Sequence, residues 1–307
     1  MKRFLSKILI AALVMLMLLG TAEWLARRCP NQYRYKVEWM EQHAAEVETL
    51  ILGSSTSYYG IHADRLASRA FSLANQGQSP RYDWLLFAAD TAHYSLLHNV
   101  ILTTPSLLLN SPREVEETSW HYCIYYHLYC HCPDHGLLSR YAWELACYPE
   151  ARKKILESLG GPLHKEACDS LGCGRRKLPS SPNPRLTPDA VEKSAQRDAK
   201  VRERIEHSEL PDYPALLAQW CQRHQVRFLL LSPPVYPDYA QKLDSMVALS
   251  AFQDSLVGAL LDRCPDVTYR DYSADPRFTA DDFFDANHLN IYGAEKFTRI
   301  IRKDFSL

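Results

Sequence analysis

Short apolar runs alternate with amphipathic stretches along most of this chain. Five of the runs predict strands, at residues 47–52, 70–74, 99–102, 226–231 and 267–269. Apolar residues at helical spacing predict helices at residues 80–93, 213–224, 242–263 and 292–303. Strands that alternate with helices form a parallel sheet with helices on both faces. The pattern therefore predicts an α/β fold, a three-layer sandwich around a mostly parallel sheet.

This alternation breaks between residues 110 and 212. A stretch at 119–129 is rich in Trp and Tyr, and a helical pattern follows at 146–159. Residues 172–188 contain many Gly, Pro, Ser and Arg residues, which predicts a loop. A polar helix is expected at 190–207. We interpret the whole region as an insertion in the α/β fold.

The N-terminal segment, residues 1–26, predicts a signal anchor or a signal peptide. Its first residues are basic (Lys2, Arg3 and Lys7), and residues 8–22 are apolar without a charge. An uncleaved anchor needs the flanking apolar residues to reach bilayer length, whereas Gly20-Thr21-Ala22 would suit cleavage. The basic residues favour a cytoplasmic N-terminus. A buried helix of a cytosolic protein is the third interpretation.

These patterns predict three parts: the anchor or signal at 1–26, a polar helical connector at 27–46, and an α/β domain at 47–307. The anchor implies contact with a membrane. The α/β domain is then expected outside the cytoplasm, in a periplasm or at the cell surface.

Composition excludes some functions and leaves others open. The net charge of −1 over 307 residues gives no basic face for nucleic acid. The basic run Arg175-Arg176-Lys177 is interpreted as part of a solvated loop. Nine cysteines suit an oxidising compartment, and Cys168 and Cys173, which flank a short loop, are predicted to form a disulfide.

Two short motifs carry candidate chemistry. Gly53-Ser54-Ser55 follows the first predicted strand, and Asp285-Ala286-Asn287-His288 precedes the last helix. In parallel sheets, ligands bind beyond the carboxyl ends of the strands, where the first motif must lie. A serine, a histidine and an aspartate that meet in space can carry out nucleophilic acyl transfer.

The order of these motifs resembles the SGNH/GDSL hydrolase superfamily, whose fold is flavodoxin-like. The resemblance makes Ser55 the nucleophile, with His288 and Asp285 as its catalytic partners. It also makes the segment Ser72–Gly77 the second family block, so that the N–H groups of Ser55 and Gly77 would stabilise an oxyanion. Ser54 replaces the usual Asp of the first block, and the Gly-x-Asn-Asp block is not evident.

The missing block leaves the side-chain oxyanion donor unassigned. The amides of Asn75 and Gln78 are the candidates because they lie beside Gly77. A similar loss occurs in membrane-anchored relatives linked to acylation of cell-surface polymers. The resemblance therefore implies a serine esterase or O-acyltransferase, without cofactor or metal, acting on an acylated glycan or another small acyl ester. The alternative is a catalytically inert scaffold of an envelope polysaccharide assembly.

Each motif also has a purely structural interpretation. Ser54, Thr56 and Ser57 are rival nucleophiles, and the Asp-x-x-His motif would also suit the cap of the last helix. Metal-ligating side chains gather at 121–135: His121, Cys123, His127, Cys130, His131, Cys132 and His135. Pro133 breaks any helix that would align them, so we interpret this region as an aromatic, partly buried helix. Its Trp and Tyr residues pack on the core or stack on sugar rings.

Overall fold

The computed structural model describes residues 2–105, 120–132, 143–146, 168–205 and 212–307. The chain divides into two compact units. One contains Met1–Tyr35 and Glu114–Ala167, and the other contains Lys36–Arg113 and Cys168–Leu307. The predicted helix at 146–159 lies almost entirely outside the described residues.

The second unit is built on a five-stranded parallel sheet. Its strands are β1 (Thr49–Ile51), β2 (Ala70–Ser72), β3 (Asn99–Thr103), β4 (Arg227–Ser232) and β5 (Thr268–Asp271). They are ordered β2-β1-β3-β4-β5, and each neighbouring pair is parallel. Strands β1, β2 and β3 are fully buried, and so is β4 after Arg227, as expected for a parallel sheet covered on both faces. The edge strand β5 is polar and only partly buried. All five predicted strands and the α/β fold are confirmed.

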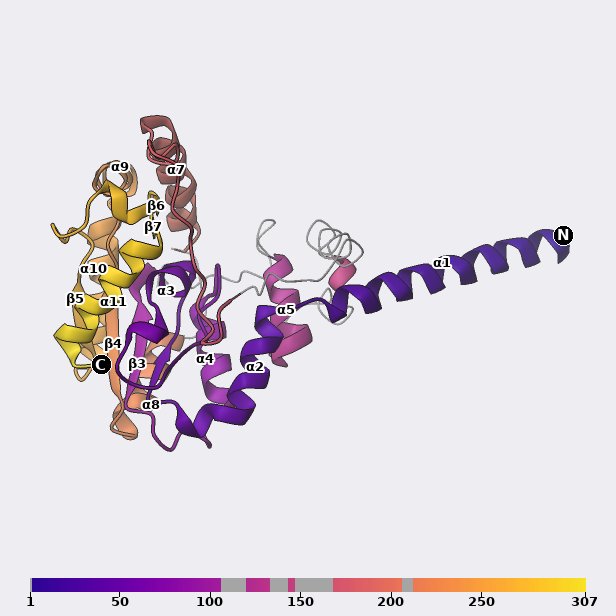
Figure 1. The fold of residues 1–307 in the computed structure, drawn as a ribbon, viewed down its shortest axis with the longest axis horizontal. Coiled ribbons are helices and arrows are strands. Elements are labelled where there is room, and N and C mark those ends of the chain that lie inside the picture. Colours follow the sequence, from indigo (N-terminus) through magenta and orange to yellow (C-terminus); the bar gives the residue numbers. More distant parts are fainter. Residues whose placement is uncertain (1, 106–119, 133–142, 147–167, 206–211) are drawn as a thin grey trace. The chain divides into compact units, whose positions relative to one another are not determined.

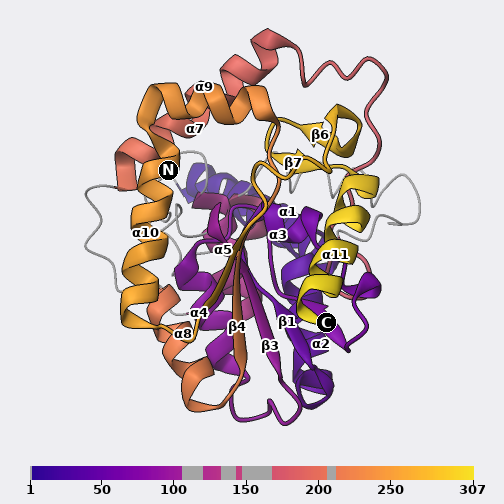
Figure 2. The same ribbon diagram turned by 90° about the vertical axis from the view of Figure 1, so that its left-hand side faces the viewer.

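Helices cover both faces of this sheet. One face carries α4 (Pro80–Ala89), α8 (Tyr213–Arg223) and α10 (Leu249–Arg263), and the other carries α11 (Ile291–Phe305). Figure 2, which looks along the sheet, shows α8 and α10 on one side of the strands and α11 on the other. This arrangement is what right-handed crossovers between parallel strands produce.

The face under α11 holds a large hydrophobic cluster. Ile51, Ile101 and Leu229 point from successive strands toward this face, and Phe297 and Ile301 come from α11 to meet them. All five are fully buried. The amphipathic pattern of 292–303 thus serves to hold the last helix on the sheet, which fixes the chain that precedes it.

The amphipathic stretch 242–263 is not one helix. The chain forms α9 (Pro237–Val247) and α10, and Ala248 between them adopts a left-handed conformation with φ of 45°. The Ala248 N–H still donates to the Asp244 carbonyl, in the usual manner of a left-handed helix C-terminus. The predicted single helix is therefore wrong at this position. The hydrophobic pattern continues through Ala248 and does not show that this residue adopts a left-handed conformation.

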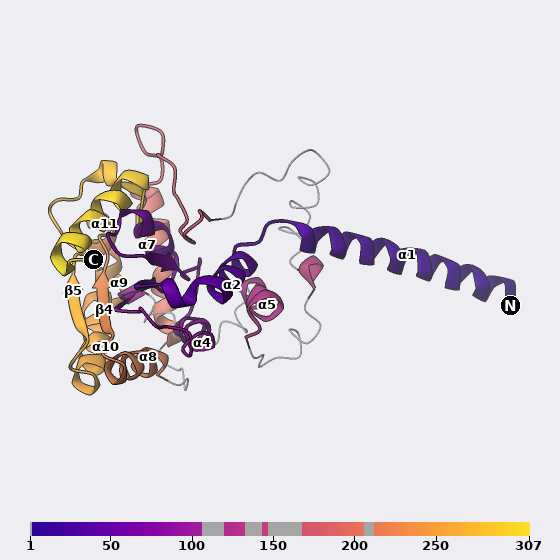
Figure 3. The same ribbon diagram turned by 60° about the horizontal axis from the view of Figure 1, so that its bottom comes forward.

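The polar helix expected at 190–207 is α7 (Pro188–Ile205). Its buried residues Val191, Ala195 and Ala199 recur every four positions and pack on Tyr239 and Leu243 of α9. Figure 3 shows the two helices side by side. This helix is therefore polar on one face only.

A loop at 168–176 is pressed against β2 and the short helix α3 (Ser55–Gly60). The Ser72 N–H donates to the Leu171 carbonyl, and the Gly174 N–H donates to the Tyr58 carbonyl. Gly172 has a φ of 79°, and a Cβ there would lie 2.2 Å from the Ser72 carbonyl oxygen. Only glycine fits this close approach of two backbones.

The disulfide predicted within this loop is wrong. Cys173 is a free thiol, and its sulfur accepts a hydrogen bond from the Ala63 N–H at 3.3 Å. The side chain belongs to the core under α11, and burial raises its pKa to about 12. Sequence spacing showed that the two cysteines were close but not that one of them points into the core.

The remaining short elements connect this framework. They are η1 (Ala44–Glu46), η2 (Ala63–Arg65), η7 (Ala280–Asp282), β6 (Phe283–Asp285) and β7 (His288–Leu289). Strands β6 and β7 form a separate antiparallel pair, beyond the carboxyl ends of the main strands and in contact with α3. Helix α2 (Gln32–His43) begins after Pro30, where the Asn31 side chain accepts hydrogen bonds from the N–H groups of Tyr33 and Arg34.

The first unit contains the apolar N-terminal helix α1 (Lys2–Arg28), labelled in Figure 1. Its 26 residues from Arg3 to Arg28 are long and apolar enough to cross a membrane. Large side chains such as Leu9 and Met15 are more than half exposed, which is unusual for a helix surrounded by water. The unit also contains α5 (Trp120–Cys130) and η6 (Glu144–Ala146).

We predict that Gly172→Ala lowers the free energy of unfolding by about 2 kcal/mol or more, because it adds both a left-handed strain and a clash with a neighbouring backbone. Chemical denaturation of the full-length protein in detergent measures this change. Gly258→Ala is the matched control. Gly258 lies in α10, and a Cβ added there would meet nothing within 4 Å, so its replacement should stabilise the protein by about 0.5–1 kcal/mol. Equal effects of the two substitutions would contradict the close packing at Gly172.

Candidate active site

Ser55 is presented by a tight turn at the end of β1. Gly53 follows the strand with a φ of 116°, which favours glycine, and the extended Ser54 then leads into α3. Ser55 is the first residue of α3 and is only partly buried. The turn therefore lifts its side chain out of the buried sheet at the carboxyl edge.

Asp285 and His288 face each other across a two-residue hairpin. Asp285 ends β6 and His288 begins β7, with Ala286 and Asn287 as the turn. The Asp285 Oδ1 accepts hydrogen bonds from the N–H groups of Asn287 at 3.2 Å and of His288 at 3.0 Å. The spacing Asp-x-x-His therefore reflects a carboxylate-bound turn.

Asn290 secures this hairpin to α11. Its side-chain oxygen accepts from the N–H groups of Tyr292 and Gly293, so Asn290 is the N-cap of the last helix. Its amide donates to the Asp281 carbonyl at 2.6 Å. The helix cap expected in this region is thus Asn290, which leaves the side chains of Asp285 and His288 to face each other.

The three side chains predicted to meet do form a continuous hydrogen-bonded chain. The Ser55 Oγ lies 2.8 Å from the His288 Nε2, across 233 residues of sequence. The His288 Nδ1 lies 2.8 Å from the Asp285 Oδ1. Burial by itself would raise the pKa of Asp285. The net effect is a lowered pKa, because the carboxylate accepts hydrogen bonds from the His288 side chain and the Asn287 N–H and lies near the charges of His288 and Arg176. Asp285 is therefore ionised at neutral pH.

The neighbouring hydroxyls are engaged elsewhere. The Thr56 Oγ1 and the Ser57 Oγ each lie 2.9 Å from the Thr103 Oγ1, at the end of β3. The Ser54 Oγ lies 3.3 Å from the Thr56 Oγ1, and Ser54 and Ser57 are buried. Geometry thus favours Ser55 over its three rivals, because its hydroxyl is the one in contact with the imidazole among these described residues.

The backbone N–H groups of Ser55 and Gly77 stay predicted oxyanion donors. Ser55 begins α3, so its N–H has no acceptor within the helix. Gly77 has a φ of 63°, in the left-handed region that favours glycine. The Asn75 N–H donates to the Gly53 carbonyl at 3.2 Å, which holds the two turns together.

The two candidate side-chain amides belong to a buried network. The Asn75 amide donates to the Leu73 carbonyl at 3.2 Å and to the Gln78 Oε1 at 2.9 Å. The Gln78 amide donates to the Asp83 Oδ1 at 2.6 Å. Both residues are fully buried. Their role as oxyanion donors stays a prediction, and it would require the Asn75 amide to exchange a present partner.

Asp83 was not predicted from the sequence, yet it joins both turns. Its Oδ1 accepts from the Gly53 N–H at 2.7 Å as well as from Gln78. Its Oδ2 has no hydrogen-bond partner among the described residues. Burial raises the pKa of Asp83 to about 7, although the two hydrogen bonds act in the opposite direction. Its position in α4, 30 residues after Gly53, gave no sequence signal.

Arg176 is a second residue that sequence reasoning missed. It is partly buried, and its guanidinium carbon lies 4.0 Å from the ring centre of Tyr59. The Tyr59 and His288 rings form a T-shaped pair, with their centres 6.0 Å apart. The interpretation of residues 175–177 as a solvated loop is therefore wrong for Arg176, although Lys177 is exposed.

The His and Cys cluster does not align on one helix. Helix α5 ends at Cys130, and His131 has a left-handed φ of 53°. Within the part of the chain that the structure describes, no group of three ligating side chains is placed to hold a metal ion. His135 and the side chain of His121 lie outside the described residues.

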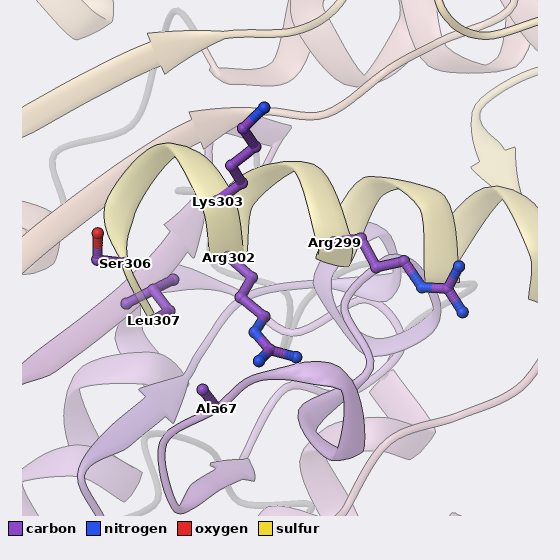
Figure 4. A pocket seen from close by; sticks show the side chains of 6 residues that line it. All are labelled: Ala67, Arg299, Arg302, Lys303, Ser306 and Leu307. Carbon is purple, nitrogen blue, oxygen red and sulfur yellow. The ribbon is translucent and has the colours of Figure 1, made fainter.

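A basic hollow lies at the far end of α11 from His288. It is lined by Ala67, Arg299, Arg302, Lys303, Ser306 and Leu307 (Figure 4). The 15 residues of α11 span about 22 Å, so this hollow is separate from the Ser55 site.

We predict that the stability of the protein falls as pH rises from about 4 to 7, because native Asp83 keeps its proton in this range and the unfolded chain does not. Asp83→Asn removes this titration. Between about pH 4 and 7, wild type should lose up to about 4 kcal/mol in free energy of unfolding relative to Asp83→Asn. Above about pH 7 the difference between the two proteins should stay constant. Denaturation at several pH values measures it, with Asp262→Asn on the exposed side of α10 as control. A constant difference between wild type and Asp83→Asn would contradict the raised pKa.

Comparisons with known proteins add little to this geometry. No protein-family model matches the chain, and no curated protein matches it. Among solved structures, the chain is similar to one described as "a putative platelet activating factor from Streptococcus pneumonia". The identity is 12%, the match covers 96% of this chain and 98% of that chain, and the TM-score is 0.41. A TM-score at this level does not establish a shared fold.

Proposed function

We propose that this protein is a serine-dependent esterase or O-acyltransferase of the SGNH type that acts on acyl esters of cell-envelope or extracellular glycans. The observation that carries the proposal is the contact between the Ser55 hydroxyl and the His288 imidazole, backed by Asp285. Three residues with these roles, in this order of contact, are the arrangement that activates a serine.

In the first step, the Ser55 oxygen attacks the acyl carbon while the His288 Nε2 takes the serine proton. The ionised Asp285 accepts from the His288 Nδ1 and stabilises the imidazolium that forms. The resulting tetrahedral intermediate collapses when the bond to the alcohol breaks. His288 then returns its proton to the leaving alcohol, and the acyl group stays on Ser55.

The negative charge on the intermediate needs donors at the carboxyl edge of the sheet. We assign this role to the N–H groups of Ser55 and Gly77, each worth about 3 kcal/mol in the transition state. The Asn75 and Gln78 amides support the Gly77 turn in the present network. One of them becomes a third donor only if substrate binding rearranges that network.

The second step decides between the two activities. His288 takes a proton from an acceptor hydroxyl, whose oxygen attacks the acyl carbon and releases Ser55. Water as acceptor gives an esterase, and a sugar hydroxyl gives an O-acyltransferase. Both activities share the acyl-enzyme, so the triad supports them equally.

The cellular setting of the proposal rests on α1. The length and composition of α1 support a membrane span, and with its basic residues in the cytoplasm the Ser55 site would lie on the other side of the membrane. The acylated polymers of a cell envelope lie in that space, and this chain resembles membrane-anchored relatives linked to their acylation. The inert scaffold alternative keeps its two sequence arguments, Ser54 in place of Asp and the missing Gly-x-Asn-Asp block. A scaffold would have no use for an aligned serine, histidine and aspartate.

We predict that a fluorophosphonate probe labels the full-length protein and that Ser55→Ala abolishes the labelling. Such probes react with a serine activated by a neighbouring base, which here is His288. Labelling is measured by gel fluorescence and by mass spectrometry of the modified peptide.

Ser57→Ala is the matched control, since its hydroxyl lies two residues away and contacts Thr103 instead of the imidazole. It should retain labelling. The scaffold alternative expects no labelling of any form, and persistent labelling of Ser55→Ala would mean a different nucleophile.

We also predict that protease added to right-side-out membrane vesicles degrades residues beyond α1, whereas the same residues in inverted vesicles are protected. The reason is that the basic N-terminus of α1 stays in the cytoplasm. Immunoblotting against the C-terminal region measures protection. Protection in right-side-out vesicles would contradict the extracytoplasmic location.

A further inference from the structure

Arg176 lies between two rings that belong to the elements carrying the triad. Its guanidinium carbon is 4.0 Å from the ring centre of Tyr59 and 4.6 Å from that of Phe284. Tyr59 is one helical turn after Ser55 in α3, and Phe284 directly precedes Asp285 in β6. The cation is thus placed beside both halves of the site.

The backbone holds Arg176 in this position. The Ile291 N–H donates to the Arg176 carbonyl at 2.9 Å, at the start of α11. Two residues earlier, the Gly174 N–H donates to the Tyr58 carbonyl, and a Cβ on Gly174 would lie 2.3 Å from the Tyr58 ring. An arginine whose backbone is anchored and whose side chain is stacked between rings loses little entropy when it binds a ligand.

The adjacent Arg175 shows what a structural arginine does in this loop. Its guanidinium lies 3.0 Å from the Asp64 carboxylate and 2.9 Å from the Asp169 carboxylate. Arg176 makes no such ion pair with the described residues, and its buried Nε has no hydrogen-bond partner among them. The two rings cover the faces of the guanidinium. Its N–H groups point along the plane between the rings, where they can donate hydrogen bonds.

A buried N–H without an acceptor, such as the Nε–H of Arg176, is costly unless a ligand supplies one. The geometry points to Arg176 as an anion-binding subsite of the Ser55 site, so that the substrate carries a carboxylate or a phosphate on the glycan close to the acylated hydroxyl. This inference rests on the proposed function and names its substrate class. Arg185, an exposed residue whose guanidinium carbon lies 4.3 Å from the Phe284 ring centre, adds a second positive charge beside the subsite.

A merely structural role for Arg176 has a different signature. Arg176 helps to keep Asp285 ionised, and losing that effect would slow the reaction of charged and neutral substrates alike. An anion-binding role instead changes selectivity between matched substrates. The test therefore measures a ratio of rates.

The probes are three acetate esters of para-substituted phenols: 4-acetoxybenzoate, 4-acetoxyphenyl phosphate and the neutral 4-acetoxybenzamide. In each case the Ser55 oxygen forms a bond to the acetyl carbon, the bond to the phenol oxygen breaks, and the proton passes through His288 to the phenolate. Phenol release gives kcat/KM for the full-length protein, corrected for the alkaline hydrolysis rate of each ester. This step is common to an esterase and an acyltransferase.

Wild type should prefer at least one anionic ester over the amide by about tenfold or more, the value of a charge-assisted hydrogen bond. The preferred ester tells a carboxylate from a phosphate. Arg176→Gln should abolish the preference while the neutral ester still reacts, whereas Arg175→Gln, which removes the same charge one residue away, should keep it.

No preference in wild type, or an equal loss for charged and neutral esters in Arg176→Gln, would overturn the anion subsite and leave the proposed function intact. If none of the three esters reacts, or if they react without dependence on Ser55, the proposed function is overturned and the subsite with it.

Discussion

The left-handed turn at Gly53 is the constraint on which the site depends. It stops β1, reverses the chain out of the buried sheet and begins α3 with Ser55. The same residue donates its N–H to Asp83 and accepts from the Asn75 N–H through its carbonyl. The Ser55 turn and the Gly77 turn are therefore coupled, and a serine in this position can meet an imidazole that a hairpin brings from a distant part of the sequence.

The fold was largely predictable because the signals that specify it are local and repeated. Buried parallel strands appear as apolar runs, and the last helix as an amphipathic pattern, so the strands, their parallel arrangement and the final helix were all predicted within a few residues. The break at Ala248 was missed because an alanine gives no sign that it will adopt a left-handed conformation. The state of Cys173 was missed because it depends on which way a loop faces, and a sequence motif does not carry that information.

The residues of the candidate site were likewise predicted only where a local sequence signal marks them. Ser55, Asp285 and His288 were found because the Gly-x-Ser and Asp-x-x-His motifs are short and ordered. Asp83 and Arg176 were missed because their importance comes from burial and from partners far away in sequence. The sequence does not distinguish Arg175 from Arg176, because both are arginines in the same loop. The packing of the loop shows that Arg175 is ion-paired and that Arg176 is stacked on rings beside the site.

The contact between residues 233 positions apart has a consequence for how the protein is made. Ser55 and His288 cannot meet until the segment that carries β7 and α11 has been synthesised and docked. The Leu307 carbonyl, which accepts from the Ala67 N–H, helps to hold this segment in place. Contacts of such high contact order form late in folding. A chain in which this segment has not yet folded therefore lacks the contact between Ser55 and His288.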